Sequence, residues 1–121
     1  MPKLETQSVL ELQKLVKIFC EDRDWDQFHT LKDLAIGVST EANELLDLCR
    51  FKSDRQINEL LNTPSFKFKV EYELADVFFF ILRIAQMYKV DLASALEIKL
   101  QANAIKYPIE ISKGSNKKYN E

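Results

Sequence analysis

The sequence predicts an all-α fold, and three observations support this. Apolar residues recur at helical spacing almost throughout the 121 residues, no stretch shows the alternation of a strand, and the chain contains only 2 Gly and 3 Pro. With 46% hydrophobic residues, the chain is long enough to bury a sizeable core without disulfides. We expect a single domain over residues 1–111 and a flexible polar tail over residues 112–121.

The first helix is predicted over about residues 4–22. Its buried face is made by residues at helical spacing, namely Val9, Leu12, Val16 and Phe19. An acidic, irregular segment follows and contains the only Trp and the only His of the chain, Trp25 and His29, on either side of Phe28. A Trp in a polar loop favours a ligand contact. Core packing explains Phe28 at least as well, and for His29 a structural role and a substrate contact are equally open.

A second helix is predicted from Thr30, a good N-cap, to about Phe51. Gly37 inside it costs about 1 kcal/mol relative to Ala, which the close approach of a neighbouring helix or a ligand would explain. Residues 52–62 are expected to form a short amphipathic helix or an ordered loop. Pro64 restarts the chain, and a long central helix should cover about residues 65–89.

The last helix is predicted over residues 92–106, capped by Asp91 and ended by Pro108. Lys99, Asn103 and Lys106 recur at helical spacing and so share one face, next to Tyr107. This face is either an ordinary solvated stripe or a clamp for phosphate and sugar, and the spacing alone leaves both open.

Two acidic motifs stand out because each abuts an apolar stripe. Glu41 and Glu44 lie one helical turn apart in the second helix, as do Glu73 and Asp76 in the central helix. Carboxylates brought within about 5 Å of each other repel by roughly 3 kcal/mol per pair at an effective dielectric near 20. Hard oxygen ligands of this kind suit Mg²⁺, with Mn²⁺ also possible. The competing interpretation is that both motifs are solvated helix faces.

Composition limits the function classes. A net charge of -2 argues against a protein that binds nucleic-acid polymers, which would carry a basic stripe. Cys20 and Cys49 are expected to be buried free thiols in a reducing cytosol, which predicts a cytoplasmic protein. We expect neither a signal peptide nor a membrane span, since the longest apolar run, residues 77–82, is far too short.

These residues together resemble the MazG-like all-α nucleoside triphosphate pyrophosphohydrolases, in the small branch related to the dCTP pyrophosphatases. The similarity covers about residues 15–110 and depends on one ordered set of motifs, namely Arg23-Asp24-Trp25, Gln27-Phe28-His29, Glu41-x-x-Glu44, Glu73-x-x-Asp76 and Lys99-x-x-x-Asn103-x-x-Lys106-Tyr107-Pro108. The resemblance implies a bundle of four to five helices completed by oligomerisation, as a homodimer or as a homotetramer made of two dimers.

The resemblance also implies a reaction and a site. A nucleoside triphosphate, here dCTP or a modified pyrimidine deoxynucleotide, would be hydrolysed to the monophosphate and pyrophosphate as nucleotide-pool house-cleaning. The residues expected to hold Mg²⁺ and to be catalytic are Glu41, Glu44, Glu73 and Asp76. Those expected to contact substrate are Trp25, Phe28, His29, Phe51, Phe80, Lys99, Asn103, Lys106 and Tyr107. Phe51 and Phe80 replace a Trp and a Tyr of the relatives, so the base preference is open.

Two further classes compete with the enzyme. A helical oligomerisation or regulatory module could hold a structural cation in its acidic pairs and turn over nothing. A di-iron carboxylate bundle would need Glu-x-x-His pairs, whereas the single His lies outside both acidic motifs.

Overall fold

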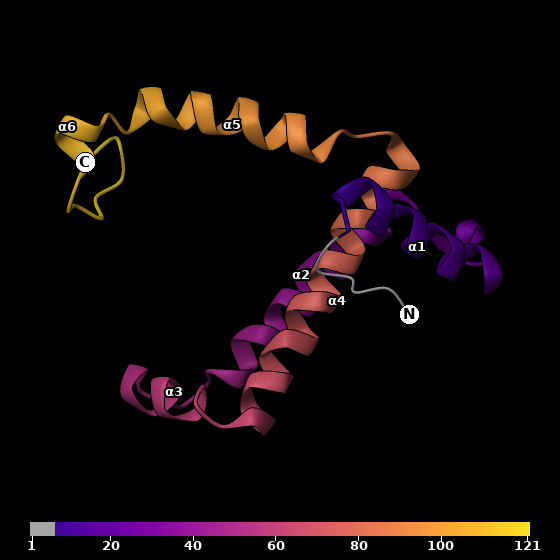
Figure 1. Ribbon diagram of the computed structural model, residues 1–121, viewed down its shortest axis with the longest axis horizontal. Coiled ribbons are helices and arrows are strands. Elements are labelled where there is room, and N and C mark those ends of the chain that lie inside the picture. Colours follow the sequence, from indigo (N-terminus) through magenta and orange to yellow (C-terminus); the bar gives the residue numbers. More distant parts are fainter. Residues whose placement is uncertain (1–6) are drawn as a thin grey trace. The chain divides into compact units, whose positions relative to one another are not determined.

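The computed structural model describes residues 7–121, and over these residues the chain is entirely helical apart from turns and loops. Its elements are α1 (Val9–Asp22), the 3₁₀ turn η2 (Asp26–Phe28), α2 (Leu31–Leu48), α3 (Asp54–Leu60), α4 (Pro64–Tyr88), α5 (Leu92–Lys106) and α6 (Ile109–Ser112). The α-helices among them are labelled in Figure 1. The all-α prediction is confirmed. The short α6 adds one helix to the four to five expected within the described residues.

Local side-chain chemistry explains where most helices begin. The Ser8 hydroxyl accepts a hydrogen bond from the Glu11 amide at the start of α1, so that helix begins at Val9. The predicted beginning near Leu4 lies outside the described residues. Thr30 caps α2 by accepting from the Asp33 amide, as the sequence predicts. A capping box between Ser53 and Gln56 starts α3, which makes residues 54–60 a helix rather than a loop.

One predicted boundary is wrong. The second helix was expected to reach Phe51, but α2 ends at Leu48. Phe51 adopts a left-handed backbone conformation with φ of 61°, which no helix can continue through. The long central helix matches its prediction closely, since α4 starts at Pro64 and ends where Lys89 turns left-handed with φ of 56°.

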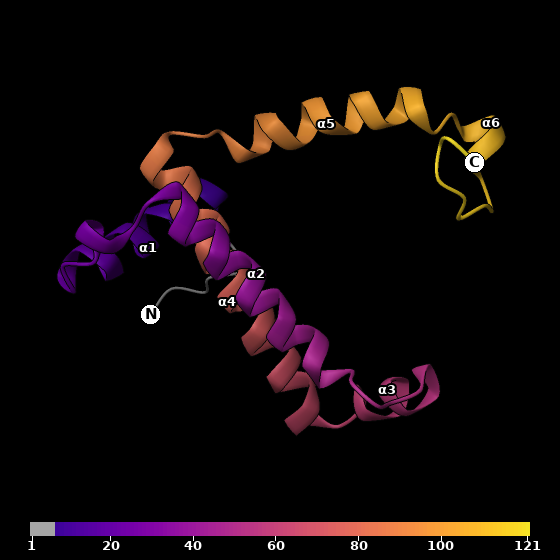
Figure 2. The ribbon, with the colours of Figure 1, turned by 180° about the vertical axis from the view of Figure 1, so that it is seen from behind.

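The described residues divide into two compact units, residues 7–89 and residues 90–121. In the first unit α2 lies alongside α4, as the two opposite views in Figures 1 and 2 both show. Helix α1 also packs on α4, where the rings of Phe19 and Phe79 meet edge to face with centroids 5.9 Å apart. Among the described residues the buried apolar side chains are few, namely Cys20, Leu34, Phe66, Leu82 and Ala85.

The glycine in α2 has the role expected of it. A Cβ atom on Gly37 would lie 2.5 Å from Cε1 of Phe80, because the Phe80 ring of α4 occupies that space. The close approach of a neighbouring helix therefore explains why a glycine is tolerated inside α2. Both cysteines are free thiols as predicted, but only Cys20 is buried and Cys49 is half-buried. Burial raises the pKa of Cys20 above its ordinary value.

The second unit consists of α5 and α6 with the residues that follow. Asp91 caps α5 by accepting from the Ser94 amide at 3.0 Å, as predicted. After α6 the chain returns toward α5, because the Tyr119 ring meets the Tyr107 ring edge to face at 6.0 Å and lies 4.9 Å from the ammonium of Lys106. Whether residues 112–121 form a flexible tail stays a prediction.

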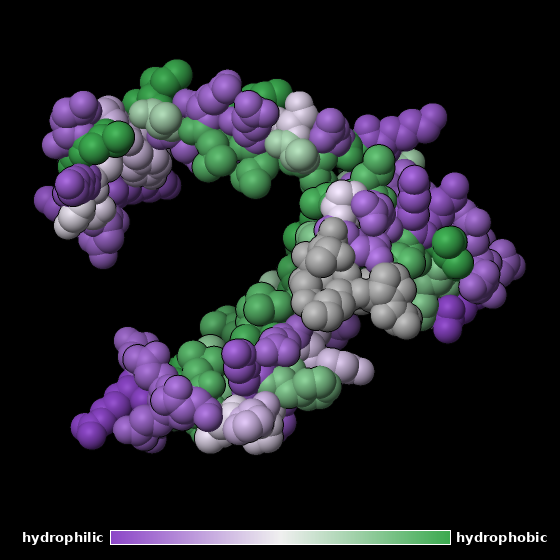
Figure 3. Space-filling view, viewed as in Figure 1, coloured by the Kyte–Doolittle hydropathy of each residue, from purple (hydrophilic) through white to green (hydrophobic). Residues whose placement is uncertain are grey.

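Each unit leaves apolar side chains exposed. On α4 these include Leu74 and Phe78, and on α5 they include Leu96, Ile98 and Leu100. Figure 3 shows hydrophobic side chains on the surface over the helix pair of the first unit and over α5. Among the described residues, every helix is too short or too polar to cross a membrane.

Candidate functional site

The two acidic motifs meet between α2 and α4. Glu41 and Glu44 project from α2, while Glu73 and Asp76 project from α4, and one carboxylate oxygen from each lies within 4.8 Å of all the others. Glu44 is exposed and the other three are half-buried. We call these four residues the acidic cluster. The one-turn spacing within each motif, together with the side-by-side packing of the two helices, produces this convergence.

The acidic cluster lacks compensating charge from the described residues. None of their ion pairs includes a cluster carboxylate, and one oxygen each of Glu41 and Glu73 is buried without a hydrogen-bond partner among them. Burial, and after it the nearby Glu44 carboxyl, raises the pKa of Glu41 and that of Glu73. Four oxygen donors of one charge, two of them with buried and unpaired atoms, fit a hard divalent cation.

An apolar cavity opens beside the acidic cluster. It has a volume of about 470 Å³, within the range of small-molecule pockets. Its lining joins carboxylates to aromatic rings, and consists of Leu15, Val16, Phe19, Trp25, Glu41, Asp76, Phe79 and Phe80. A flat aromatic group placed there would have stacking partners and would lie beside the acidic cluster.

The structure brings only some of the predicted substrate residues to this cavity. Trp25 and Phe80 line it, whereas Phe28 is 62% exposed and Phe51 is 90% exposed, and neither is in the lining. Lys99, Asn103 and Lys106 lie on α5 in the second unit, with Tyr107 directly after it. Asn103 is half-buried, and the other three are exposed. The roles of all these residues stay predictions.

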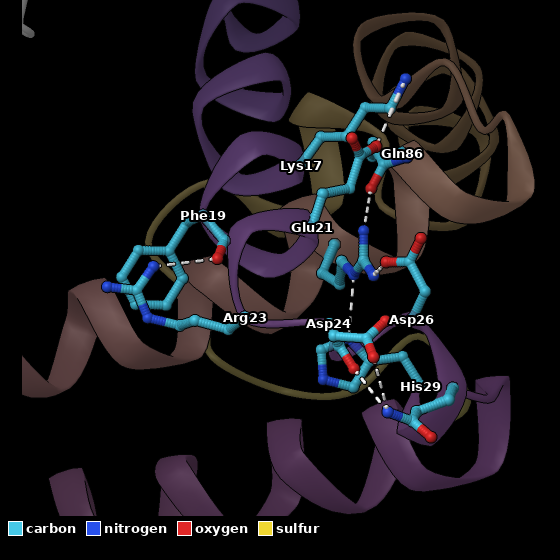
Figure 4. A network of polar contacts seen from close by, with 10 residues as sticks. Lys17, Phe19, Glu21, Arg23, Asp24, Asp26, His29 and Gln86 are labelled. Atoms are coloured by element: carbon cyan, nitrogen blue, oxygen red, sulfur yellow. Dashed lines mark hydrogen bonds and ion pairs between the residues drawn. The ribbon is translucent and has the colours of Figure 1, made fainter.

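His29 takes part in a polar network that the sequence did not reveal. The guanidinium of Arg83, which is 1% exposed, donates from Nε to His29 Nδ1 at 2.9 Å and from Nη1 to Gln86 Oε1 at 2.5 Å. Its Nη2 donates to the Asp26 carboxylate. Figure 4 shows Asp26, His29 and Gln86 around the shared guanidinium. We call Arg83 with these three partners the arginine network.

Burial and the Arg83 charge lower the pKa of His29, while Asp26 and Asp33 oppose this shift. The available signal for Arg83 was its position on α4, where a charged residue follows the apolar run that ends at Leu82. It lies seven residues after Asp76 and therefore on the same side of the helix.

Comparison with known proteins agrees with this architecture. No known family profile matches the chain. Over 111 residues, which are 92% of this chain, it is 30% identical to dCTP pyrophosphatase 1 of Bos taurus and 32% identical to that of Mus musculus. The chain spans 66% and 65% of the length of these two relatives, just under two thirds.

One solved structure matches this chain over most of its own length. The crystal structure of a pyrophosphatase from Archaeoglobus fulgidus superposes with a TM-score of 0.75 at 32% identity, and the match covers 81% of this chain and 90% of that one. An all-α fold with converging Glu-x-x-Glu and Glu-x-x-Asp motifs defines a class of helical proteins with a carboxylate centre. Within that class, the chain belongs to the MazG-like all-α nucleoside triphosphate pyrophosphohydrolases, in the branch related to the dCTP pyrophosphatases.

Proposed function

We propose that the protein hydrolyses a deoxynucleoside triphosphate to the monophosphate and pyrophosphate, with Mg²⁺ or Mn²⁺ held by the acidic cluster. The observation that supports this most directly is the convergence of four carboxylates, two with buried and unpaired oxygens, beside an aromatic cavity. The names of the relatives from Bos taurus and Mus musculus, dCTP pyrophosphatase 1, support the same reaction and point to dCTP. A modified pyrimidine deoxynucleotide is the alternative substrate in this proposal.

The acidic cluster supplies the catalytic residues in this proposal. Mg²⁺, when bound, polarises the phosphate chain and stabilises its developing negative charge. Glu41, Glu73 and Asp76 hold the metal from half-buried positions, and the exposed Glu44 completes the set. One of the four carboxylates orients the attacking water. The water oxygen bonds to the α-phosphorus and gives up a proton to that carboxylate, the bond between the phosphorus and the bridging oxygen breaks, and pyrophosphate leaves.

The cavity supplies the base pocket. Trp25 and Phe80 stack a base, a contact worth about 1 to 3 kcal/mol per base. His29 contributes from beside Trp25, with ring centroids 6.1 Å apart. Phe28 and Phe51 are retained as weaker candidates, because their exposure leaves them free to contact a ligand or a second copy of the chain. Lys99, Asn103, Lys106 and Tyr107 are assigned to the phosphate chain and sugar.

We also propose an oligomeric state and a cellular role. The apolar side chains exposed on α4, including Leu74 and Phe78, suit burial against a second copy in a homodimer or a homotetramer. Residues 1–111 would then form one domain of a bundle completed by that partner. A role in cleaning the nucleotide pool follows from the reaction proposed above, and the free cysteines suit a reducing cytoplasm.

The test is release of pyrophosphate from a panel of ordinary and 5-substituted deoxynucleoside triphosphates, with Mg²⁺ and with EDTA. We expect metal-dependent release of monophosphate and pyrophosphate, fastest from a pyrimidine nucleotide. If folded and oligomeric protein binds Mg²⁺ but releases no pyrophosphate from any of these nucleotides, the proposal fails. An oligomerisation or regulatory module with a structural cation then becomes the better description.

A further inference from the structure

Arg83 is the most deeply buried charged side chain of the described residues, and the proposed reaction has no use for it. All three of its nitrogens donate hydrogen bonds, and two of the acceptors, Asp26 and His29, belong to the segment that follows Trp25. We propose that Arg83 is a positioning residue for substrate binding. It anchors residues 25–29 to α4 and holds His29 as the neutral tautomer whose proton is on Nε2.

The tautomer follows from hydrogen-bond chemistry. A guanidinium has five N–H donors and no acceptor. The Nε–H of Arg83 lies 2.9 Å from His29 Nδ1, so Nδ1 must accept and cannot carry a proton. A neutral imidazole with an unprotonated Nδ1 carries its proton on Nε2. Protonation of both nitrogens would place an N–H of the ring against the N–H of Arg83.

The charges around His29 act in the same direction. Arg83 faces the ring from α4, Asp26 lies within the same segment, and Asp33 lies on α2. Asp26 and Asp33 would favour a charged ring, but Asp26 is itself bound to Arg83. Burial and the Arg83 charge together outweigh the two carboxylates, and the ring stays neutral at neutral pH.

The anchor matters for substrate because the segment of residues 25–29 places Trp25 in the wall of the cavity. Trp25 lines the cavity, and its amide donates to the Cys20 carbonyl at 3.0 Å, which ties the start of the segment to α1. The network ties the rest of the segment to α4 through Asp26 and His29. Asp76 lies two turns before Arg83 on the same helix, so Arg83 fixes where Trp25 lies relative to the acidic cluster.

The first test uses the wild-type protein and no substrate. Because the chain has a single His, ¹⁵N-histidine labelling gives one pair of ring nitrogen signals in an NMR spectrum. At pH 7 we expect a pattern in which Nε2 is protonated and Nδ1 is not. An Nδ1-protonated ring, an average of both tautomers, or a charged ring would overturn the proposal.

The second test compares Arg83→Met with Arg55→Met, a matched loss of an exposed arginine on α3. In Arg83→Met we expect His29 to exchange between both tautomers and the emission of Trp25, the only Trp, to change. KM should rise about tenfold while kcat stays within about twofold, since the wall moves but the metal ligands do not. Arg55→Met should match the wild type in all four readouts.

The conservative variant Arg83→Lys provides a second test in case Arg83→Met does not fold. Lysine keeps the charge but lacks the planar fork of donors, so it cannot hold Asp26, His29 and Gln86 together, and the Trp25 emission and KM should change again. Unchanged NMR signals, Trp25 emission and KM in both variants would overturn the proposal. The KM readout rests on the proposed function, whereas the NMR and fluorescence readouts do not. If the wild type shows no turnover, the proposed function fails, whereas the NMR and fluorescence measurements still test the role of Arg83.

Discussion

Helix α4 contributes residues to two charged sites, and the two differ in whether their charged groups have partners within the described residues. In the arginine network a buried cation has every nitrogen paired with an acceptor from its own chain. In the acidic cluster, seven residues earlier on the same helix, carboxylates of one sign converge, and two of their oxygens are buried without a partner among the described residues. The first site is complete as it stands. The second is short of positive charge.

This difference separates a structural site from a site built for an external ion. A buried charge that is fully hydrogen-bonded holds segments together and gains little from any ligand. Like charges that share a half-buried site destabilise the chain until a cation or protons neutralise them. Proximity of charges alone would not distinguish the two sites, because both gather charged side chains and both include residues of α4. The decisive property is whether the hydrogen-bonding capacity is satisfied internally.

The largest expected effect is the loss of activity when a carboxylate of the acidic cluster is replaced. Glu41→Gln or Asp76→Asn should lower the rate of pyrophosphate release by at least about a hundredfold, because each removes a charged metal ligand and metal catalysis contributes several kcal/mol. The measurement is steady-state release at saturating Mg²⁺. Glu59→Gln, an exposed change on α3, is the control and should be neutral. Near-full activity in either cluster variant would remove these residues from the metal site.

Stability without metal should change in opposite directions at the two sites. Arg83→Met removes the cation that pairs with Asp26 and should lower the free energy of unfolding by about 2 kcal/mol, less than for a fully buried pair because Asp26 is half-exposed. Glu41→Gln relieves repulsion among the carboxylates of the acidic cluster and should raise the free energy of unfolding. Urea unfolding in EDTA measures both. If both variants lose stability, the acidic cluster is not short of positive charge.

The sequence predicted the acidic cluster but not the arginine network, and the reason is the range of the interactions. Caps at Thr30 and Asp91, and carboxylates one turn apart, are set by residues three or four positions away. Arg83 bonds to residues 54 and 57 positions away in the sequence, so no local pattern could reveal its partners. The sequence did not predict the end of α2, because the residue that turns left-handed there is Phe51 and not a glycine, which is the usual sequence signal for such a turn.

The contact between Gly37 and Phe80 sharpens the comparison, because Phe80 lies between Asp76 and Arg83 on α4. Gly37→Ala adds a Cβ 2.5 Å from the Phe80 ring, and overpacking of this kind costs about 1 to 3 kcal/mol. Better helix propensity returns about 1 kcal/mol. We expect a net loss of about 1 kcal/mol in urea unfolding. A gain in stability would mean that the Phe80 ring moves away freely.

That destabilisation should disappear when the ring is removed. In a Phe80→Ala background, Gly37→Ala should become stabilising, because only the gain in helix propensity remains. The double-mutant cycle thus assigns the loss to this one contact. A persistent loss in the double variant would place the strain in the α2 backbone instead.

The smallest effect expected is the pH dependence of stability that His29 contributes. Its pKa in the folded protein is lowered by burial and by Arg83, whereas in the unfolded chain it is about 6.5. Below that pH the unfolded chain binds more protons than the folded one, so the contribution of His29 to stability falls as pH decreases from 6.5 toward the folded pKa. The carboxyls of Glu41 and Glu73, whose pKa values are raised, act in the opposite direction, because the folded chain binds their protons more readily.

Subtracting a variant without the imidazole isolates the His29 contribution. His29→Asn keeps an acceptor for Arg83 but does not titrate. The difference in unfolding free energy between wild type and His29→Asn, measured in EDTA, should be constant above pH 7 and should shift against the wild type below pH 6.5. A difference that stays flat down to pH 5 would mean that the ring takes up a proton as easily in the folded chain as in the unfolded one. The arginine network would then lack the rigid, neutral acceptor that sets it apart from the acidic cluster.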